Sequence, residues 1–500
     1  MGVIEKSIFK AVKTGEQLLL SNYTLTKKAL ESASPALLRK ISTFKAWHIY
    51  QKSLETVPAY KKFIGNKKIT SIEQVPETDK ENYVKKYSYE ERCQGGEFPV
   101  VGDIEESSGS SGQPTNWICS LSEEDMLFKV AKFEFYYVYS AYKKKYIVLS
   151  GWSSGPWATG LKFCEIIEHY TLVKNTTADI ENIIRTLKQL GPTHEYLIAG
   201  YPPFLKTLLD SDAINWKKYK IDLLTGGESN TLEWKEYLRK RLGRREARII
   251  SSYGASDIDI GIGFETPLSE FVRGLANQNP KLNEELFGVS MNPIVFQYNP
   301  TMHYIENTKK GDFTITLLDE DVASPKIKYN LHDRGGSIQF DDAQKIIATY
   351  EKKKLESFLK ENKTLKLPFL FVAGRVDGTI SIGGNNIYPQ QVGSAIQTSP
   401  YATKINRFML ASHVDEKQNV SFHVYVELQK GVTKDLKMKE VLEKCILETL
   451  LDKNLEYKEY YHNHHSNQKC LKPQVYLSLF DTDKRFKEQD GKIKNQYISR

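Results

Sequence analysis

Between residues 146 and 254, short apolar runs alternate with segments of helical period, and this alternation constrains the fold more than any other feature. The apolar runs are YIVLS (146–150), EYLIAG (195–200), IDLLTGG (221–227) and ARIISSYG (247–254). Segments between them, such as ADIENIIRTLKQL and NTLEWKEYLRKRLG, repeat their apolar residues every three or four positions. Strands that alternate with helices in this way predict a parallel sheet with crossover helices.

Two polar turns follow strands of this predicted sheet. GGESN follows the strand that ends at Leu224, and SSYGASD follows the strand that ends at Ile250. Ligands of open α/β sheets bind beyond the carboxyl ends of the strands. We therefore expect both turns to line one crevice.

The pattern changes near residue 285, which indicates a second type of structure. NPIVFQY, DFTITLLD and SPKIKYNLHD read as antiparallel strands, and a compact unit with its own strands and helices follows AGRVDG. We predict an α/β protein with parallel sheets, crossover helices and flanking antiparallel structure. A large N-terminal domain spans 1–375, with a helical part at 1–90, and a small, mobile α+β domain spans 376–500.

Composition excludes several classes of protein. Of the 500 residues, 40% are hydrophobic and 26% charged, and no stretch has the roughly 18 apolar residues that span a membrane. The five cysteines lack paired spacing, which favours free thiols in a reducing compartment. The N-terminus is typical of a short amphipathic helix and not of a signal peptide. We expect a cytoplasmic protein.

The formal charge of +8 comes from lysine-rich segments. No nucleic-acid motif accompanies this charge, so we interpret it as a solvated surface and expect no nucleic-acid partner. Self-association as a homodimer is left open.

A serine- and glycine-rich turn, SSGSSGQPT at 107–115, has the chemistry to hold a phosphate. Its glycines let backbone N–H groups turn inward, and its hydroxyls add donors. The candidate ligands are Ser107, Ser108, Gly109, Ser110, Ser111, Gly112 and Thr115. The turn is not a Walker A loop, because Gln113 stands where a lysine is needed. A plain flexible linker would have the same composition.

Five further motifs follow this turn in order: GGE (226–228), SYGASD (252–257), YNLHD (329–333), GRVDG (374–378) and DGKIKN (490–495). With them the sequence resembles the adenylate-forming superfamily of acyl- and aryl-CoA ligases, and within it the phenylacetate-CoA ligase-like branch. TVPAYKKFI and IEQVPETDKENY resemble the N-terminal helices of that branch.

The resemblance implies a nucleotide site. Residues 107–115 would hold the phosphates of ATP, and the residues that border the adenine would be Gly226, Gly227, Glu228, Ser252, Tyr253 and Gly254. Asp257 matches the acidic residue that binds Mg²⁺, with Ser256 in place of the usual threonine. Asp333 would accept hydrogen bonds from the ribose hydroxyls, and Arg375 would approach the ribose or the phosphates.

The resemblance also implies moving parts. Asp377 matches the hinge about which the small domain turns, and Lys492 matches the lysine that reaches the acyl carboxylate and the α-phosphate. Lys494 is the second choice for this lysine. Trp152 and Trp157 are candidates to line the acid pocket, or else they pack a strand–helix corner. Glu265 matches a downstream acidic position of unassigned role, and its surroundings lack the cysteines that bind zinc in some relatives.

The implied activity is a two-step ligase reaction that uses ATP, Mg²⁺ and coenzyme A. A small carboxylic acid would become an acyl-adenylate and then a thioester. A carrier-protein pantetheine or an amine is the alternative acceptor. A different reading is a catalytically idle relative that binds nucleotide, prompted by Gln113 and Asp257.

Overall fold

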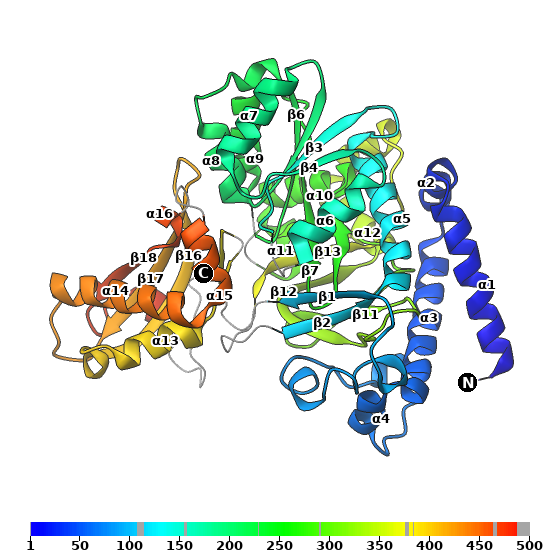
Figure 1. The fold of residues 1–500 in the computed structure, drawn as a ribbon, viewed down its shortest axis with the longest axis horizontal. Coiled ribbons are helices and arrows are strands. Elements are labelled where there is room, and N and C mark those ends of the chain that lie inside the picture. The colour runs from blue at the N-terminus through cyan, green and yellow to red at the C-terminus, as the bar shows by residue number, and fades with distance from the viewer. Residues whose placement is uncertain are drawn as a thin grey trace.

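The computed structural model of the chain describes residues 2–107, 115–154, 158–228, 230–289, 292–375, 380–383, 385–463 and 468–487. Figure 1 shows a large body built around one sheet, with the N-terminal helices along one side and the small C-terminal region on the opposite side. None of the helices in these ranges is both long and apolar enough to cross a membrane.

Parallel strands and crossover helices form one half of the large sheet. The strands are β3 (Tyr146–Ser150), β4 (Leu172–Asn175), β5 (Glu195–Ala199), β6 (Lys220–Gly226) and β7 (Ile249–Ala255), and neighbours pair in parallel. The crossovers are α6 (Ala158–Glu168), α7 (Ile180–Leu190), α8 (Pro202–Asp210) and α9 (Leu232–Leu242). The predicted parallel sheet is confirmed.

The sequence of α7 shows why these crossovers fold as helices. The side chain of Asp179 accepts a hydrogen bond from the Asn182 backbone and caps the first turn. Ile183, Ile184 and Leu187 recur on one face and are buried against the sheet strands. Gly191 ends the helix.

Antiparallel strands form the other half of the sheet, as predicted from residue 285 onward. They are β8 (Asp259–Phe264), β9 (Ile294–Gln297), β10 (His303–Asn307), β11 (Asp312–Leu317), β12 (Tyr329–Ile338) and β13 (Phe369–Arg375). The described strands make one 11-stranded sheet in the order β10-β11-β12-β13-β9-β8-β7-β6-β5-β3-β4. The helices α10 (Pro267–Gln278), α11 (Pro280–Phe287) and α12 (Phe340–Glu361) pack on β9 and β13.

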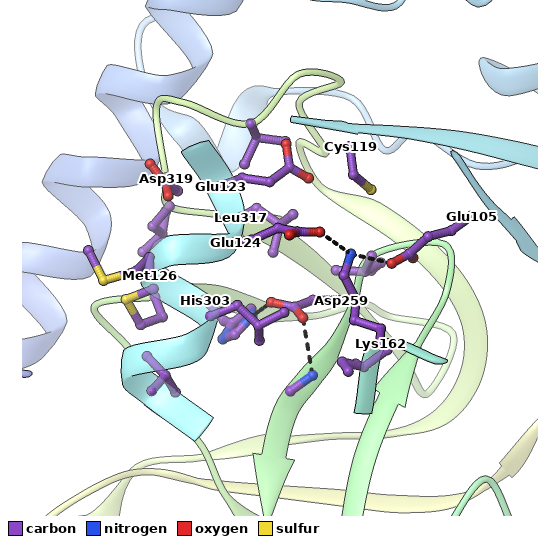
Figure 2. Close-up of a pocket in the computed structure, with 18 residues that line it drawn as sticks. Glu105, Cys119, Glu123, Glu124, Met126, Lys162, Asp259, His303, Leu317 and Asp319 are labelled. Carbon is purple, nitrogen blue, oxygen red and sulfur yellow. Dashed lines mark hydrogen bonds and ion pairs between the residues drawn. The ribbon is translucent and has the colours of Figure 1, made fainter. Parts of the chain in front are cut away.

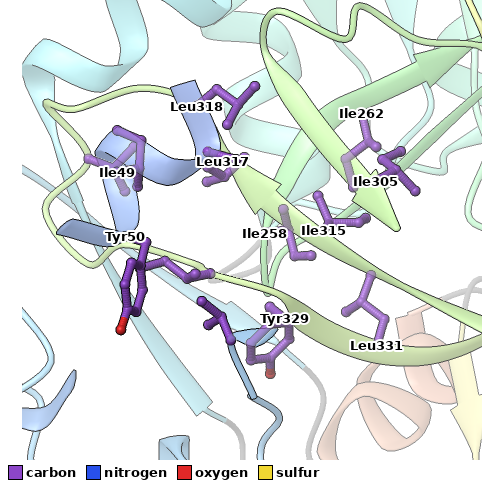
Figure 3. Packing of buried hydrophobic residues seen from close by; sticks show 14 of the residues in the cluster. Ile49, Tyr50, Ile258, Ile262, Ile305, Ile315, Leu317, Leu318, Tyr329 and Leu331 are labelled. Atoms are coloured by element: carbon purple, nitrogen blue, oxygen red, sulfur yellow. The ribbon is translucent and has the colours of Figure 1, made fainter. Parts of the chain in front are cut away.

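The N-terminal helices attach to the antiparallel half. They are α1 (Val3–Leu20), α2 (Tyr23–Ser32), α3 (Pro35–Thr56) and α4 (Pro58–Ile64), followed by the 3₁₀ turns η1 (Ile72–Gln74), η2 (Val84–Lys86) and η3 (Gln94–Gly96). Figure 3 shows Ile49 and Tyr50 of α3 in the same apolar cluster as Ile315 of β11 and Tyr329 of β12. Buried apolar side chains at this junction fix the helices to the sheet.

A hairpin and a long helix lead into the parallel half. The hairpin consists of β1 (Gly102–Ser107) and β2 (Thr115–Ser120), which pair antiparallel. The helix α5 (Leu121–Tyr139) follows directly. Because Ser107 pairs with Thr115, the two ends of the predicted phosphate loop are held side by side.

The C-terminal region has a sheet and a core of its own. Its elements are β14 (Ile380–Ile382), β15 (Asn385–Ile387), α13 (Pro389–Thr398), η5 (Ala402–Lys404), β16 (Ile405–Val414), β17 (Val420–Leu428), α14 (Leu436–Lys453), α15 (Leu455–Asn463), α16 (Gln468–Leu471), β18 (Pro473–Ser478) and α17 (Lys484–Lys487). β16, β17 and β18 form its sheet. The α/β class with a small C-terminal unit is confirmed, and the domain boundary after residue 375 stays a prediction.

Candidate functional site

The carboxyl ends of β5, β6 and β7 carry glycines that the local packing requires. At Gly227 the φ angle is +74°, and a Cβ would lie 2.9 Å from the Tyr201 ring. At Gly226 a Cβ would lie 2.8 Å from the carbonyl oxygen of Ser252. Trp152 is buried and meets Tyr201 edge to face, with ring centroids 4.7 Å apart. This end of the sheet is therefore a close-packed wall of aromatic rings and backbone.

The second polar turn is shorter than predicted. Ile249–Ala255 is all strand, so Ser252, Tyr253 and Gly254 belong to β7 and only Ser256–Ile258 form the turn into β8. β7 continues because its last residues pair with β8 after parallel pairing with β6 ends at Ser252. The side chains of the motif thus lie on a strand, where neighbouring strands fix their directions.

Tyr253, Asp333 and Arg375 come together from three strands. The Tyr253 hydroxyl donates a hydrogen bond to Asp333 Oδ2 at 2.5 Å. In the antiparallel pairing of β12 with β13, the backbone of Asp333 lies opposite that of Arg375. The Tyr253 ring is supported by Phe296, with centroids 5.8 Å apart. Asp333 thus contacts Tyr253 through its side chain and lies opposite Arg375 through its backbone.

Asp257 is the centre of a second group. Its carboxylate is buried and accepts a hydrogen bond from the Tyr329 hydroxyl at 3.0 Å. Lys80 Nζ lies 3.1 Å from Asp257 Oδ2. Burial and the neighbouring Asp257 carboxylate raise the pKa of Tyr329 well above its usual range, so the phenol stays a donor.

Lys80 also joins this group to the phosphate hairpin. Its ammonium donates to the Ser107 hydroxyl oxygen at 3.1 Å, and the Trp117 indole N–H donates to the same oxygen at 2.9 Å. Sequence reasoning named TDKENY only as part of an N-terminal helical segment and missed this lysine. No local sequence pattern marks it, because Lys80 reaches the site through an isolated bridge between Thr78 and Tyr329, the first residue of β12.

Asp257 offers a single carboxylate to a hard cation, and Lys80 already pairs with one of its two oxygens. Both protein contacts of the carboxylate are made to Oδ2, and its second oxygen is of the type that Mg²⁺ takes, together with phosphate oxygens. Asp257 would hold the ion from the protein side.

A third group lies beneath the hairpin, around Lys162 of α6 (Figure 2). The Lys162 ammonium pairs with Glu105 of β1 and lies 3.2 Å from Glu124 of α5 and 3.7 Å from Asp103 of β1. Burial raises the pKa of Glu105 to about 7, against the pull of Lys162. This lysine therefore ties the hairpin to two helices in a dry environment.

A small cavity of about 60 Å³ opens next to Lys162. Apolar side chains of α5 and β11 line one part of it, and the pair His303–Asp259, with His303 Nε2 and Asp259 Oδ2 3.6 Å apart, lines another. Asp103, Glu105 and Cys119 gather here closely enough to hold a metal ion. Lys162 already supplies the positive charge that these carboxylates need, which favours a structural ion-pair cluster.

Glu265 has a structural role. It is fully buried, forms an ion pair with the equally buried Lys235 at 2.7 Å and accepts a hydrogen bond from the Ser251 backbone at 2.6 Å. Arg273 lies 3.6 Å away. These contacts connect α9 and α10 to β7, and they account for an acidic residue at this position.

Several predicted site residues lie outside the described ranges. These are Ser108, Gly109, Ser110, Ser111, Gly112, Trp157, Asp377, Lys492 and Lys494. Ser107 and Thr115 bracket the loop, Gly226 is the last residue of β6, and Gly227 and Glu228 follow it. Among the described residues, Lys80 joins Ser107 to Asp257, and Gly226 pairs with Ser252 next to Tyr253.

No protein-family model matches the sequence, and no curated protein matches it. Solved structures do. A 2-hydroxyisobutyryl-CoA ligase with 2-HIB-AMP and CoA, in the thioesterification state, superposes with a TM-score of 0.61 at 13% identity over 94% of this chain and 91% of that one. The chain has the fold of this 2-hydroxyisobutyryl-CoA ligase.

Two further structures of the 2-hydroxyisobutyryl-CoA ligase are similar. An open conformation with 2-HIB-AMP and CoA has a TM-score of 0.51 at 13% identity, over 91% of this chain and 90% of that one. The postadenylation state with 2-HIB-AMP also has a TM-score of 0.51 at 13% identity, over 91% and 89%. At this identity the likeness concerns the fold.

Proposed function

We propose that the chain activates a small carboxylic acid with ATP and transfers the acyl group to a thiol, as a member of the phenylacetate-CoA ligase-like branch. The observation that carries the proposal is the Lys80 bridge, which joins Ser107 at the start of the phosphate loop to Asp257. A partly buried cation between a hydroxyl-rich loop and a carboxylate is suited to a polyphosphate with its metal ion.

The roles of the other residues follow from their chemistry. Asp333, fixed by Tyr253, would accept both ribose hydroxyls because a carboxylate offers only acceptors. Arg375 would donate to the ribose or the phosphates. Gly226, Gly227, Glu228, Ser252 and Gly254 would form the slot for the adenine. Mg²⁺, when bound, would neutralise phosphate charge from its place on Asp257.

The proposed reaction has two steps, adenylation of the acid and transfer of the acyl group. A carboxylate oxygen of the acid attacks the α-phosphorus of ATP, the new P–O bond gives the acyl-adenylate, and pyrophosphate leaves. The thiol sulfur then attacks the acyl carbon, loses its proton and displaces AMP. Lys492 would offset the charge that builds up in the first step. Coenzyme A is the acceptor that the resemblance favours, ahead of a carrier-protein pantetheine or an amine.

A screen tests the proposal. Aryl, fatty and amino acids are offered with ATP and Mg²⁺, with and without coenzyme A, and pyrophosphate exchange and thioester are read separately. We expect exchange with at least one acid class, and thioester only when coenzyme A is present. Pyrophosphate exchange without thioester formation would mean that the acceptor in the second step is a carrier protein or an amine. Absence of exchange with every acid would favour the idle nucleotide-binding reading.

Lys492→Ala is the first variant to measure. Removing the ammonium should slow pyrophosphate exchange by roughly 100-fold or more, with ATP binding largely kept, because the charge acts on the transition state. Lys494→Ala, two residues away, is the matched control and should exchange like the wild type. The reverse result would assign the catalytic role to Lys494.

A further inference from the structure

The outward face of α1 is an apolar stripe without a partner in the described chain. Ile4 is 77% exposed, Ile8 48% and Leu18 67%. Ala11 and Gly15 continue the stripe between them at helical spacing, and both are exposed. The opposite face carries the buried Phe9 and Leu20. The helix is therefore apolar on both of its long faces, although only one of them packs on the protein.

The stripe ends next to further exposed leucines. Leu19 is 41% exposed, and its carbonyl oxygen accepts a hydrogen bond from the Thr26 hydroxyl of α2. Leu25 of α2 is 53% exposed, and Leu37 in the first turn of α3 is 56% exposed. Exposed aliphatic residues of this size are unremarkable singly, but the run from Ile4 to Leu18 along one face of α1 is of the kind that marks an interaction site.

Charge identifies the partner. Residues 1–40 contain seven basic and three acidic residues, a net formal charge of +4. The exposed charged residues in this segment are Lys6, Lys10, Lys28, Arg39 and Lys40, all of them basic. Glu5, Glu16 and Glu31 are partly buried, and Glu16 pairs with Lys45 at 2.5 Å. Beyond this segment, Glu55 of α3 is exposed and lies 4.0 Å from Lys6, so the stripe lies among cations of which one faces an exposed anion.

This distribution of charge argues against a second copy of the chain as the partner. Two copies joined through α1 would bring like charges together, which costs free energy. A lipid surface with anionic headgroups attracts the cations and accepts the aliphatic row without a matching groove. We propose that the outward face of α1, together with Leu25 at the start of α2, docks on an anionic membrane surface.

The surrounding contacts make the stripe a rigid docking face. Lys13 on α1 lies 2.5 Å from Asp321 and 3.6 Å from Asp319 in the loop after β11. Lys45 of α3 donates to the Thr301 carbonyl oxygen at 2.7 Å. Figure 1 shows α1 on the side of the molecule away from the C-terminal region. Docking through α1 would hold the body at the lipid surface and leave the small region clear of it.

Vesicle co-sedimentation with the full chain tests the proposal. The probes are vesicles of phosphatidylglycerol mixed with phosphatidylcholine, and vesicles of phosphatidylcholine alone. We expect the wild type to sediment with the first and not the second, and binding to weaken as salt rises. The triple variant Ile4→Ser, Ile8→Ser, Leu18→Ser should lose roughly tenfold or more in partitioning.

Leu172→Ser with Leu436→Ser is the matched control, because these leucines are 72% and 79% exposed at other places on the surface. It should sediment like the wild type. Equal sedimentation of the triple variant would overturn the proposal. If the wild type binds neither kind of vesicle but elutes from size-exclusion chromatography as a dimer, and the triple variant elutes as a monomer, the face would be the contact with a second copy of the chain. The readout needs no catalysis, so it stands apart from the proposed activity.

Discussion

Lys80 and Asp257 concentrate opposite charge where the strand ends meet the N-terminal segment. The ammonium lies 3.1 Å from both the Asp257 carboxylate and the Ser107 hydroxyl oxygen. Its side chain is 23% exposed, so water screens it only in part. A nucleotide phosphate near Ser107 would meet a positive charge that is already held in position, which lowers the entropic cost of binding.

Lys80→Met tests this role. Loss of one charge-assisted contact of about 1.5–3 kcal/mol should lower kcat/KM for ATP by roughly 10- to 100-fold. Steady-state pyrophosphate exchange at varied ATP gives the value. Lys85→Met is the control, since Lys85 pairs at the surface with Glu81 four residues before it. Equal kinetics for both variants would remove Lys80 from the site.

The sequence predicts the carboxylates of the site better than its lysines. Asp257, Asp333 and the loop at 107–115 stand in motifs whose order can be read from the chain. Lys80 stands in a charged segment without such a motif, and it reaches Asp257 only because Thr78 pairs with Tyr329. That pairing depends on tertiary structure, and no local pattern reports it.

At the scale of elements, ion pairs with the buried Lys162 hold the hairpin β1–β2 in position. The carboxylates of Glu105 and Asp103 on β1 and Glu124 on α5 converge on the Lys162 ammonium from α6. α6 begins directly after the segment 151–157, in which Trp152 packs against Tyr201. The lysine therefore connects the proposed phosphate loop with the proposed acid pocket.

Lys162→Met should destabilise the chain and disturb the hairpin. Removing one member of a buried ion cluster leaves carboxylates without a partner and costs about 3 kcal/mol. Urea unfolding measures the free energy, and KM for ATP should rise in parallel. Lys129→Met on α5 removes only a surface pair with Asp125 and should change stability by less than about 0.5 kcal/mol. Comparable losses in both variants would contradict the assignment.

The attachment of α1 and α3 depends on pH through Glu320. Contacts with His48, and then Lys52 and Lys13, lower its pKa from 4.5 to about 2. A depressed carboxyl pKa stabilises the fold above the unfolded value, and the stabilisation is lost as pH falls from 4.5 toward 2. Glu320→Gln should cost about 1 kcal/mol at neutral pH after solvent screening, with the difference from wild type shrinking below pH ~4.5.

Urea unfolding of Glu320→Gln and wild type across this pH range gives the comparison. Glu351→Gln on α12 is the control, because Glu351 pairs with Lys354 far from α1. A difference that grows as the pH falls would have the wrong sign and would contradict the assignment.

The alternation of runs at 146–254 was enough to predict the parallel half of the sheet, because period alone separates its strands from its helices. The union of both halves into one sheet was not predictable. It depends on β7, which pairs in parallel with β6 and antiparallel with β8 through an irregular register near Tyr253. Such a register is set by backbone geometry and leaves no mark in composition.

At the scale of the whole molecule, two units with separate cores meet near the end of β13. The C-terminal core lies entirely between Ile380 and Val475, and Ser381 donates a hydrogen bond to the Gly227 carbonyl oxygen at 3.3 Å. The small unit therefore touches the glycine turn of the proposed adenine slot. A contact of this kind allows the unit to turn without unfolding either core.

Asp377→Pro tests the proposed hinge. Proline fixes one backbone angle, so adenylation should continue near the wild-type rate while thioester formation falls by roughly tenfold or more. Single-turnover assays with preformed acyl-adenylate separate the two steps. Asp377→Ala, which leaves the backbone free, should perform both steps. Equal loss of both steps in the proline variant would place the hinge elsewhere.

The strand β13 ends at Arg375, opposite Asp333, so the same few residues hold the proposed ribose contacts and begin the connection to the small unit. On the proposed function, nucleotide held by Arg375 would shift the orientation of the small unit to the extent that the two orientations bind nucleotide with different affinity. Thermodynamic linkage makes these two effects equal in size. Nucleotide affinity measured with the hinge locked in each orientation would therefore report how strongly bound nucleotide couples adenylation to the later transfer step.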